Sequence, residues 1–418
     1  MNFIEKTFFN DTAGFMTVRH LSLHGTNFQI GQKLGELAVE RYGQTPDDYT
    51  ANPLYTRARL AYFQRNYPVH CERVRGVYSA FGLDPLDERY DLTGLWYNLD
   101  VPLPPMGCSV VYYPPSRTAS GFGYLSRNYD FSTGSMADVM QMPVPSQVKE
   151  QLPRVMGEPY IMEWYPEDGG YASIAIHAFD TLSGTLDGMN SAGLVVSIMA
   201  DEEAIAELGS KLEVHPGTPG AVGLHELQVM RFVLDTCATA DEAKQALLTI
   251  KQYYAFVPCH YIVADKSGSS FIYENSTGRN VQHIIDSEGQ PQIVTNFQIH
   301  KHQTLDQMPV GAMTMETNAF WRYLRLADRI SEQEDLFTPD DLKANNACVN
   351  IMRLFEELGA DPTFGSIAAN VQARTLWHSL YDQGAGSVEF SFYLGEEVNA
   401  DGSFAEQRSD FLKFVLKA

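Results

Sequence analysis

The chain has 418 residues, enough for one large domain with an attached segment or for two domains. Its hydrophobic content of 44% and aromatic content of 12% indicate an ordered globular protein. A net charge of -22, from 52 acidic against 30 basic residues, argues against nucleic acid and anionic lipid as partners, because both require a basic surface.

The spacing of the cysteines and the pattern of apolar residues indicate the cellular compartment in which the protein works. The five cysteines are widely spaced and include no Cys-x-x-Cys pair, which argues against a disulfide framework or a cysteine zinc site and favours a reducing compartment. The first residues lack the basic and apolar regions of a secretory signal, and no apolar run has the length of a bilayer. We therefore expect a cytoplasmic protein without a membrane span.

The first hundred residues have a mainly helical pattern. After a turn at 25–27, apolar residues recur at helical spacing over 28–37, and the same spacing returns over 60–81. A proline-rich stretch at 101–105 predicts an extended tether that leads to Gly107.

From Cys108 onward, runs rich in β-branched and aromatic residues alternate with helical patterns. Strands are predicted at 108–113, 122–127, 159–164, 172–177, 193–200, 260–265, 270–274, 292–296, 375–382 and 388–394. Helices are predicted at 222–236, 239–250, 318–332 and 338–357. This succession favours two packed sheets with helices outside, an α/β/β/α sandwich, although the pattern alone leaves other architectures open.

Cys108 is the main candidate for a nucleophile. It opens a predicted strand, and the next strand carries Arg127 and Asp130. A cation favours the reactive thiolate, and a carboxylate can orient the group that takes up the thiol proton. Cys108 alone is equally compatible with a buried structural cysteine, because free cysteines are among the most buried residues.

The segments 107–109 and 126–130 together resemble the N-terminal-nucleophile cysteine hydrolases, namely the acyl-coenzyme A:isopenicillin N acyltransferase family and the related choloylglycine hydrolases. In these families the cysteine becomes residue one of the mature chain, and an Arg-Asn-x-Asp or Asn-Trp-Asp turn follows it. Ser126 departs from the bile salt enzymes, which usually have glycine there. The resemblance extends from His24 to Tyr393.

The resemblance implies an α+β fold, a four-layer α/β/β/α sandwich with a helical N-terminal pro-segment. Residues 1–107 would form the pro-segment, removed by autocleavage between Gly107 and Cys108, and residues 108–418 the hydrolase domain. The freed α-amine of Cys108 would titrate near pH ~8 and serve as the base for its own thiol. Asp130 would hold this amine, and Arg127 would favour the thiolate; the alternative is a surface ion pair on a hairpin.

Two further residues come from the same resemblance. Asn296 follows the apolar residues 293–294 and matches a Thr-Asn pair whose amide lies at the substrate carbonyl; a side-chain cap of a turn is the alternative. Residues 318–326 resemble a helix start whose first arginine approaches the cysteine. By position this is Arg322, with Arg325 as the alternative on the same helical face.

Other polar residues are predicted to have no catalytic role. Asn190 is interpreted as a turn residue of a hairpin. Ala200 stands where the bile salt enzymes have an oxyanion asparagine, so the second oxyanion donor stays open. We expect His300 and His302 to be solvated rather than metal ligands, and we expect no cofactor and no metal.

The sequence thus predicts a self-processing cysteine amidohydrolase that cleaves a linear amide C–N bond through an acyl-thioester on Cys108. Its partner would be a small-molecule N-acyl amide. An acyltransferase that passes the acyl group to an amine stays open, as does a catalytically silent binding homologue. A bile salt hydrolase is disfavoured by the long leader before Cys108. The acyl and amine parts of the substrate, and whether the protein forms a homo-oligomer, stay open.

Overall fold

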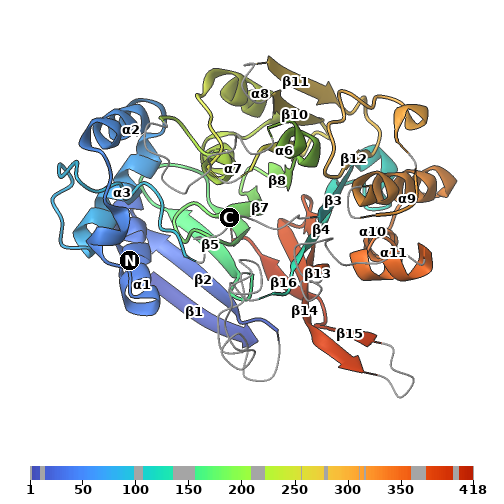
Figure 1. Ribbon diagram of the computed structural model, residues 1–418, viewed down its shortest axis with the longest axis horizontal. Coiled ribbons are helices and arrows are strands. Elements are labelled where there is room, and N and C mark those ends of the chain that lie inside the picture. The colour runs from blue at the N-terminus through green and yellow to red at the C-terminus, as the bar shows by residue number, and fades with distance from the viewer. Residues whose placement is uncertain are drawn as a thin grey trace.

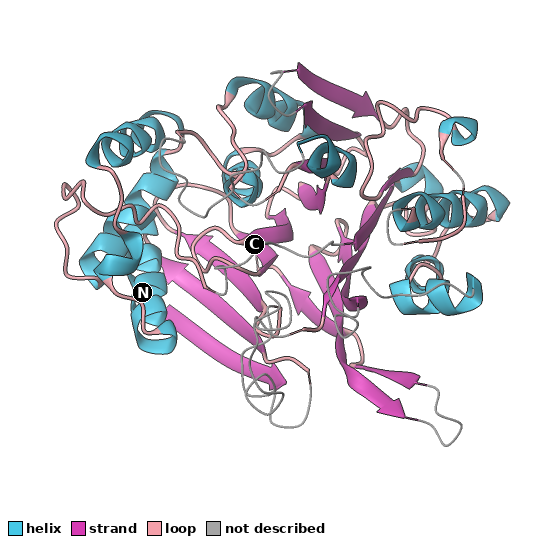
Figure 2. Cartoon of the chain, viewed as in Figure 1, coloured by secondary structure: helices cyan, strands magenta, loops and turns pink. Residues whose placement is uncertain are grey.

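Two β-sheets with helices on their outer sides make up the computed structural model of the chain (Figures 1 and 2). The proline-rich stretch at 101–105 lies outside the residues that the structure describes. The described residues are 2–9, 15–97, 107–134, 156–208, 222–255, 257–276, 281–309, 311–314, 317–358, 373–398 and 404–417.

Nine strands from the described residues form the larger sheet, in the order β1-β2-β5-β6-β7-β8-β9-β10-β11. Neighbouring strands are antiparallel except β2 and β5, which are parallel. Their bounds are β1 Asn2–Phe9, β2 Val18–Gly25, β5 Tyr160–Pro166, β6 Ser173–His177, β7 Thr185–Asn190, β8 Val195–Ala200, β9 Cys259–Ala264, β10 Ser270–Ser276 and β11 Val281–Asp286.

Seven strands in the described parts of the chain form the second sheet, in the order β12-β3-β4-β13-β14-β15, with β16 also pairing with β14. All of these pairs are antiparallel. The bounds are β3 Gly107–Tyr113, β4 Tyr124–Ser132, β12 Gln292–Val294, β13 Ala373–Asp382, β14 Ser387–Val398, β15 Phe404–Arg408 and β16 Leu412–Val415.

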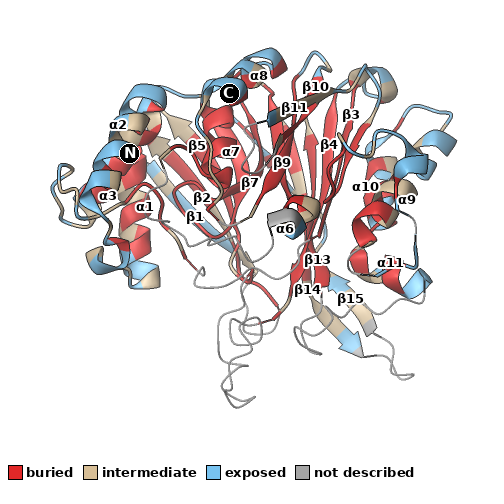
Figure 3. Ribbon diagram, turned by 45° about the horizontal axis from the view of Figure 1, so that its top comes forward, coloured by how far each residue is buried: buried red, intermediate tan, exposed pale blue. Residues whose placement is uncertain are grey.

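The helices pack on the outer sides of the sheets. α7 contacts β7 and β8 of the larger sheet, whereas α9, α10 and α11 contact β3, β4, β12 and β13 of the smaller one. Figure 3 shows buried strands between these helices. The helix bounds are α1 Asn27–Tyr42, α2 Pro53–Asn66, α3 Pro68–Ala80, α6 Glu202–Leu208, α7 Glu226–Thr236, α8 Ala240–Thr249, α9 Asn318–Glu332, α10 Pro339–Ala347 and α11 Ile351–Leu358.

The main hydrophobic core lies where the two sheets face each other. Contacts between β3 and β8 join the sheets, and one buried cluster contains Val110 of the smaller sheet together with Val196 and Ile262 of the larger one. Cys108 belongs to this cluster. The fold is therefore a mixed α/β arrangement with two large sheets, and the candidate nucleophile lies between them. None of the described helices is both long and apolar enough to cross a bilayer.

The N-terminal segment contains two strands besides the helices that its mainly helical pattern predicted. α1, α2 and α3 match the helical pattern, but β1 and β2 are strands of the larger sheet, and β2 pairs with β5 in parallel from Arg19 to Gly25. Local pattern could not indicate this pairing, because the partner strand is more than a hundred residues away. In β2, Leu21 and Leu23 are both buried, which is the period-two signal that the short stretch offered.

The predicted helix at 338–357 is wrong in one respect, since the structure has two helices, α10 and α11. Asn350 begins the second, because its Oδ1 accepts a hydrogen bond from the Arg353 N–H and its carbonyl accepts one from the Leu354 N–H. Asparagine is a preferred residue at this position. The predicted strands and the remaining helices are present to within a few residues, while β7, α6, β11, β15 and β16 were not predicted as helices or strands.

Candidate active site

Cys108 is the second residue of β3 and is almost completely buried, with 2% of its surface exposed. Its Sγ accepts a hydrogen bond from Nη2 of Arg127 at 3.3 Å. Arg127 lies on the neighbouring strand β4, whose register sets Cys108 opposite Tyr129 and Gly107 opposite Asp130. Pairing of β3 with β4 thus brings the predicted cation to the predicted nucleophile.

Arg127 is itself held by the larger sheet. Nη1 donates to Oδ2 of Asp187 and to the carbonyl of Leu186, both at 2.7 Å, and Nη2 donates to the carbonyl of Ile198 at 2.8 Å. Asp187 also accepts a hydrogen bond from the Tyr381 hydroxyl. The sequence analysis missed this role of Asp187. The signal available in the sequence was its place just before the hairpin residues 188–190.

Burial raises the pKa of the Cys108 thiol, and the nearby carboxylate of Asp130 adds to this effect. Arg127 and Arg322 act in the opposite direction, but burial outweighs them. Arg127 therefore lowers the pKa as the sequence predicted, yet the net shift favours the thiol. A proton acceptor is needed before the sulfur can attack a carbonyl.

Asn296 and Arg322 contact the backbone of Cys108. Oδ1 of Asn296 accepts the Cys108 N–H and Nη2 of Arg322, both at 2.8 Å, and Nδ2 of Asn296 donates to the Ala200 carbonyl at 2.9 Å. Two donors on Oδ1 fix the orientation of the amide. Nη1 of Arg322 donates to the Cys108 carbonyl and, at 3.0 Å, to Ser109 Oγ.

The structure also separates the two candidate arginines of α9. Arg322 is fully buried, and its Nε donates to Oδ1 of Asn318 at 2.9 Å. Arg325 instead forms a partly exposed ion pair with Glu357 at 3.1 Å. Of these two arginines of α9, Arg322 is the one that contacts Cys108.

Asp130 lies beside the Gly107–Cys108 junction. Its Oδ1 accepts a hydrogen bond from Thr375 Oγ1 at 2.6 Å, whereas the buried Oδ2 has no hydrogen-bond partner among the described residues. Nη1 of Arg322 lies 3.9 Å from Oδ2. A Cβ added to Gly107 would lie 3.0 Å from Oδ2, so this oxygen lies close to the Gly107 backbone. Burial raises the pKa of Asp130.

A cavity of about 40 Å³ adjoins Cys108. Its lining is mainly apolar, but it contains the carboxylate of Glu226, which accepts hydrogen bonds from the backbone N–H groups of Ala255 and Val257 at 2.7 and 3.0 Å. The lining residues are Cys108, Arg127, Tyr129, Phe179, Leu186, Ile198, Ala200, Glu226, Leu227, Val257 and Cys259. The cavity can hold a group of only a few heavy atoms.

The two histidines expected to be solvated are partly buried and each pairs with a glutamate. His300 Nδ1 lies 2.6 Å from Glu274, and His302 Nε2 lies 2.9 Å from Glu203. These carboxylates come from β10 and α6, so their proximity depends on the tertiary fold. Within the described residues, no group of three or more His, Cys, Asp or Glu side chains could hold a metal ion.

Asn190 has the contacts of a hairpin residue. Its Oδ1 accepts the N–H groups of Ala192 and Leu194, and its Nδ2 donates to the carbonyls of Leu234 and Cys237. Ala200 offers only its backbone, and its carbonyl accepts the amide of Asn296.

Comparison with known proteins gives one family match. The family model for acyl-coenzyme A:6-aminopenicillanic acid acyl-transferase matches residues 116–356. This range contains Arg127, Asp130, Asn296 and Arg322 and begins after Cys108. No curated protein sequence matches the chain.

Several solved structures are similar to the chain. A mutant of the conjugated bile acid hydrolase from Clostridium perfringens is 13% identical with a TM-score of 0.48, and the match covers 73% of this chain and 96% of that one. Another variant of the same hydrolase is 13% identical with a TM-score of 0.46, covering 74% and 97%. The penicillin V acylase from Agrobacterium tumefaciens is 17% identical with a TM-score of 0.39, covering 68% and 82%.

Proposed function

The chain belongs to the acyl-coenzyme A:6-aminopenicillanic acid acyl-transferase family, and from this membership we propose that it is a self-processing cysteine amidohydrolase with Cys108 as nucleophile. The observation that carries the proposal is the set of contacts around this residue. Arg127 contacts its sulfur, Asn296 its amide nitrogen and Arg322 its carbonyl oxygen.

Self-cleavage would begin with attack of the Cys108 thiol on the Gly107 carbonyl carbon. The C–N bond between the two residues breaks, a thioester forms, and the thiol proton leaves with the new α-amine. Water then cleaves the thioester, which leaves a carboxyl group on Gly107 and restores the thiol. Glycine suits this position, because any side chain would collide with Asp130.

The unpartnered oxygen of Asp130 supports this role. A buried acceptor without a partner costs on the order of 1–3 kcal/mol. The α-ammonium formed by cleavage would be a donor beside Gly107, where Oδ2 already lies. Asp130 would then hold the amine close to its own sulfur, where the neutral amine acts as the base for the next attack.

In turnover, the sulfur would attack the carbonyl carbon of an N-acyl amide, and the α-ammonium would protonate the leaving amine. Nδ2 of Asn296 has two N–H groups and donates one to Ala200, so the other can donate to the oxyanion. One such donor typically contributes about 3 kcal/mol to the lowering of the barrier. Arg322 would position both Asn296 and Cys108.

The same proposal includes the layer arrangement of the fold and the division of the chain into a pro-segment and a hydrolase domain. Helices on the outer sides of two facing sheets support a four-layer α/β/β/α sandwich. The junction before Cys108 divides the chain into a pro-segment, 1–107, and a hydrolase domain, 108–418. Parallel pairing of β2 with β5, and the buried ion pair of Arg73 with Asp235, support retention of the first fragment after cleavage. A cytoplasmic location also stays a proposal.

An acyltransferase is the second candidate, and the small apolar cavity beside Cys108 favours it. Transfer to an amine requires that the thioester be protected from water, and an apolar pocket around the acyl group gives this protection. The choice between water and an amine as acceptor does not change the roles of the residues.

Intact-mass analysis of the purified protein tests the proposal. Wild type should separate into fragments 1–107 and 108–418, whereas Cys108→Ala should stay one chain. In a separate assay against a panel of N-acyl amides, wild type should release amine from at least one of them, and Cys108→Ala should release none. Cys259→Ala is the matched control, because Cys259 is also buried and lines the same cavity. A wild-type protein that stays intact and hydrolyses no amide of the panel would contradict the proposal.

A further inference from the structure

A second cavity lies on the other face of the smaller sheet, and we name it the outer cavity. Its volume is about 470 Å³, within the range of small-molecule sites. It is enclosed by α10 and α11 on one side and by strands β4, β13, β14 and β15 on the other. Its lining residues are Asn128, Lys343, Ala344, Asn346, Ala347, Asn350, Met352, Arg353, Glu356, Thr375, His378, Ser391, Glu396, Glu406, Arg408 and Phe411.

The outer cavity is distinct from the candidate active site. Consecutive residues of a strand point to opposite faces of the sheet. On β4, Arg127 reaches Cys108 and the larger sheet, whereas Asn128 points the other way and donates to the Asn346 carbonyl of α10 at 2.8 Å. A molecule in the outer cavity therefore cannot contact the Cys108 sulfur.

Among the described residues, charges of both signs line the outer cavity in equal number, in a protein whose net charge is -22. The cations are Lys343, Arg353 and Arg408, and the anions are Glu356, Glu396 and Glu406. Burial, together with Arg408 and Lys343, lowers the pKa of His378 to about 3, so this ring adds no charge near neutrality. A lining with both signs of charge suits a ligand with both signs of charge.

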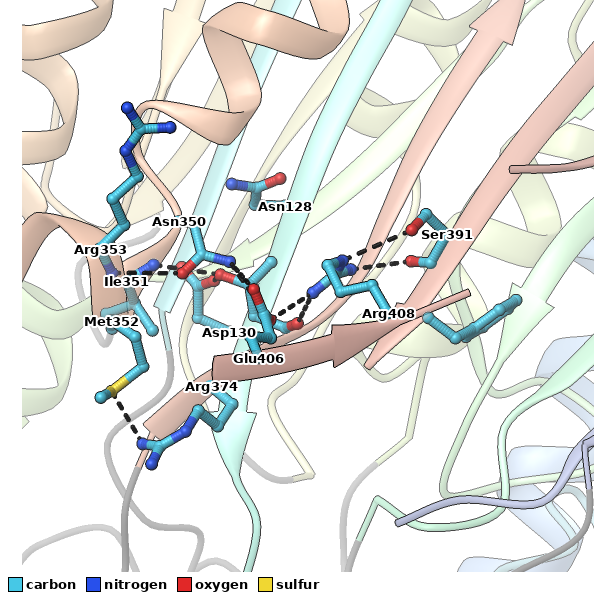
Figure 4. Close-up of polar contacts among 12 residues, drawn as sticks. Asn128, Asp130, Asn350, Ile351, Met352, Arg353, Arg374, Ser391, Glu406 and Arg408 are labelled. Carbon is cyan, nitrogen blue, oxygen red and sulfur yellow. Dashed lines mark hydrogen bonds and ion pairs between the residues drawn. The ribbon is translucent and has the colours of Figure 1, made fainter. Parts of the chain in front are cut away.

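Part of this lining forms a rigid frame. Nδ2 of Asn350 donates to Glu406, Arg408 donates to Glu406 at 2.7 Å, and Arg408 also donates to the carbonyl of Ser391 at 2.9 Å (Figure 4). Glu356 is different, because it has no hydrogen-bond or ion-pair partner among the described residues. It lies three residues after Arg353 on α11, so both side chains lie on the same side of the helix.

Asn346, which lines the outer cavity, has a side-chain amide whose hydrogen bonds are not satisfied by the described residues. Its side chain is fully buried, and neither its Oδ1 nor its Nδ2 has a partner among the described residues. Buried amides normally have partners, so such a group requires an explanation. A ligand with a donor and an acceptor close together would satisfy both atoms.

We propose that the outer cavity is a binding site for a small zwitterion, a free α-amino acid. Nε of Arg353 donates to Glu357 at 3.0 Å, and its Nη groups pair with the carboxylate of the ligand. Glu356 pairs with the ammonium group of the ligand, and Asn346 takes up a remaining donor or acceptor. Phosphorylated ligands are disfavoured by the three glutamates, and purely apolar ligands by the charged lining.

The bound amino acid would also influence Asp130. Thr375 lines the outer cavity and donates to Oδ1 of this carboxylate. A ligand that contacts Thr375 changes the environment of Asp130 without contacting Cys108. This consequence rests on the proposed function, whereas the binding site itself does not.

Calorimetric titration of the full chain with each of the twenty L-amino acids tests the site. At least one should bind saturably, and propionate and ethylamine, which each have one of the two charges, should bind at least about tenfold more weakly. Arg353→Gln and Glu356→Gln should each weaken binding of the amino acid by about tenfold. Cys108→Ala, which stays uncleaved, should still bind the amino acid saturably, which separates the site from the proposed function.

A steric variant completes the test. Ala347 is exposed on α10 and lines the cavity, so Ala347→Trp fills it and should abolish binding. Ala61→Trp is the matched control, an exposed helical alanine of α2 that does not line the cavity, and should bind normally. Melting curves confirm that each variant is folded. The proposal is overturned if no amino acid binds wild type saturably, if propionate or ethylamine binds as well, or if folded Ala347→Trp binds normally.

Discussion

Substitution of Gly107 by alanine should slow self-cleavage while leaving the mature enzyme intact. An added Cβ would lie 2.9 Å from Cβ of Asp130 and 3.0 Å from its Oδ2. Carbon atoms prefer separations of about 3.5–4.0 Å, so Asp130 or the strand must move by about 0.6–1 Å. A misplacement of about 1 Å in a reacting group can cost about 10²-fold in rate, and we expect this loss for the cleavage step.

The assay is a time course of intact mass on freshly purified protein at pH 7. Gly107→Ala should convert from one chain to two about 10² times more slowly than wild type. After cleavage, residue 107 is no longer joined to Cys108, so the turnover rate per cleaved molecule should equal that of wild type. Slow self-cleavage combined with a normal turnover rate distinguishes a local effect on Asp130 from general misfolding, which would lower both rates.

Gly311→Ala is the matched control, because a Cβ at Gly311 meets no atom within 4 Å. It should cleave at the wild-type rate. Cleavage of Gly107→Ala at the wild-type rate would refute the reasoning, since Asp130 could then be displaced without consequence. Normal cleavage followed by a loss of turnover would refute it as well.

Three other predictions follow from the same contacts. Asn296→Ala should lower the single-turnover acylation rate by about 10²–10³ with little change in substrate affinity, and a loss of affinity alone would make Asn296 a binding contact. Burial raises the pKa of Asp235, but the flanking arginines outweigh it and lower the value to about 2. The stabilisation from this carboxylate is therefore present above pH ~4 and is lost as the pH falls towards 2, so the melting temperature of Asp235→Asn should depend less on pH in this range than that of wild type. Thr375→Val removes the hydrogen bond that lowers the pKa of Asp130, so the acidic limb of self-cleavage should move to higher pH; Thr181→Val, whose buried hydroxyl has no partner among the described residues, should leave it unchanged.

Short-range sequence pattern was sufficient for much of the fold. The paired strands β3 and β4 follow each other with a short connection, so the relation of Cys108 to Arg127 could be predicted from the chain order. The parallel pair β2 and β5 could not, because about 135 residues separate its strands and nothing in either strand specifies the partner.

In the candidate site, too, contacts between residues far apart in the chain could not be predicted from the sequence. Asn296 and Arg322 were identified by motif, but the motif did not indicate that both contact the backbone of Cys108 rather than its sulfur. Asp187 was missed because its contact with Arg127 requires the two sheets to face each other. The ion pairs of His300 and His302 were missed for a similar reason, since their glutamates come from distant elements.

Asp130 connects the two faces of the smaller sheet. Its Oδ2 lies against Gly107 without a hydrogen-bond partner among the described residues, and its Oδ1 is held by Thr375, which lines the outer cavity. Because burial raises its pKa, each donor that is added or removed changes the fraction of the carboxylate that is ionised. The proposed cleavage would add such a donor from the side of Cys108, and a ligand that displaces the hydroxyl of Thr375 would remove one from the other side. Through this carboxylate, the proposed self-processing and the proposed binding in the outer cavity would be thermodynamically coupled. A ligand that favours one state of Asp130 would then bind the cleaved and uncleaved chains with different affinities.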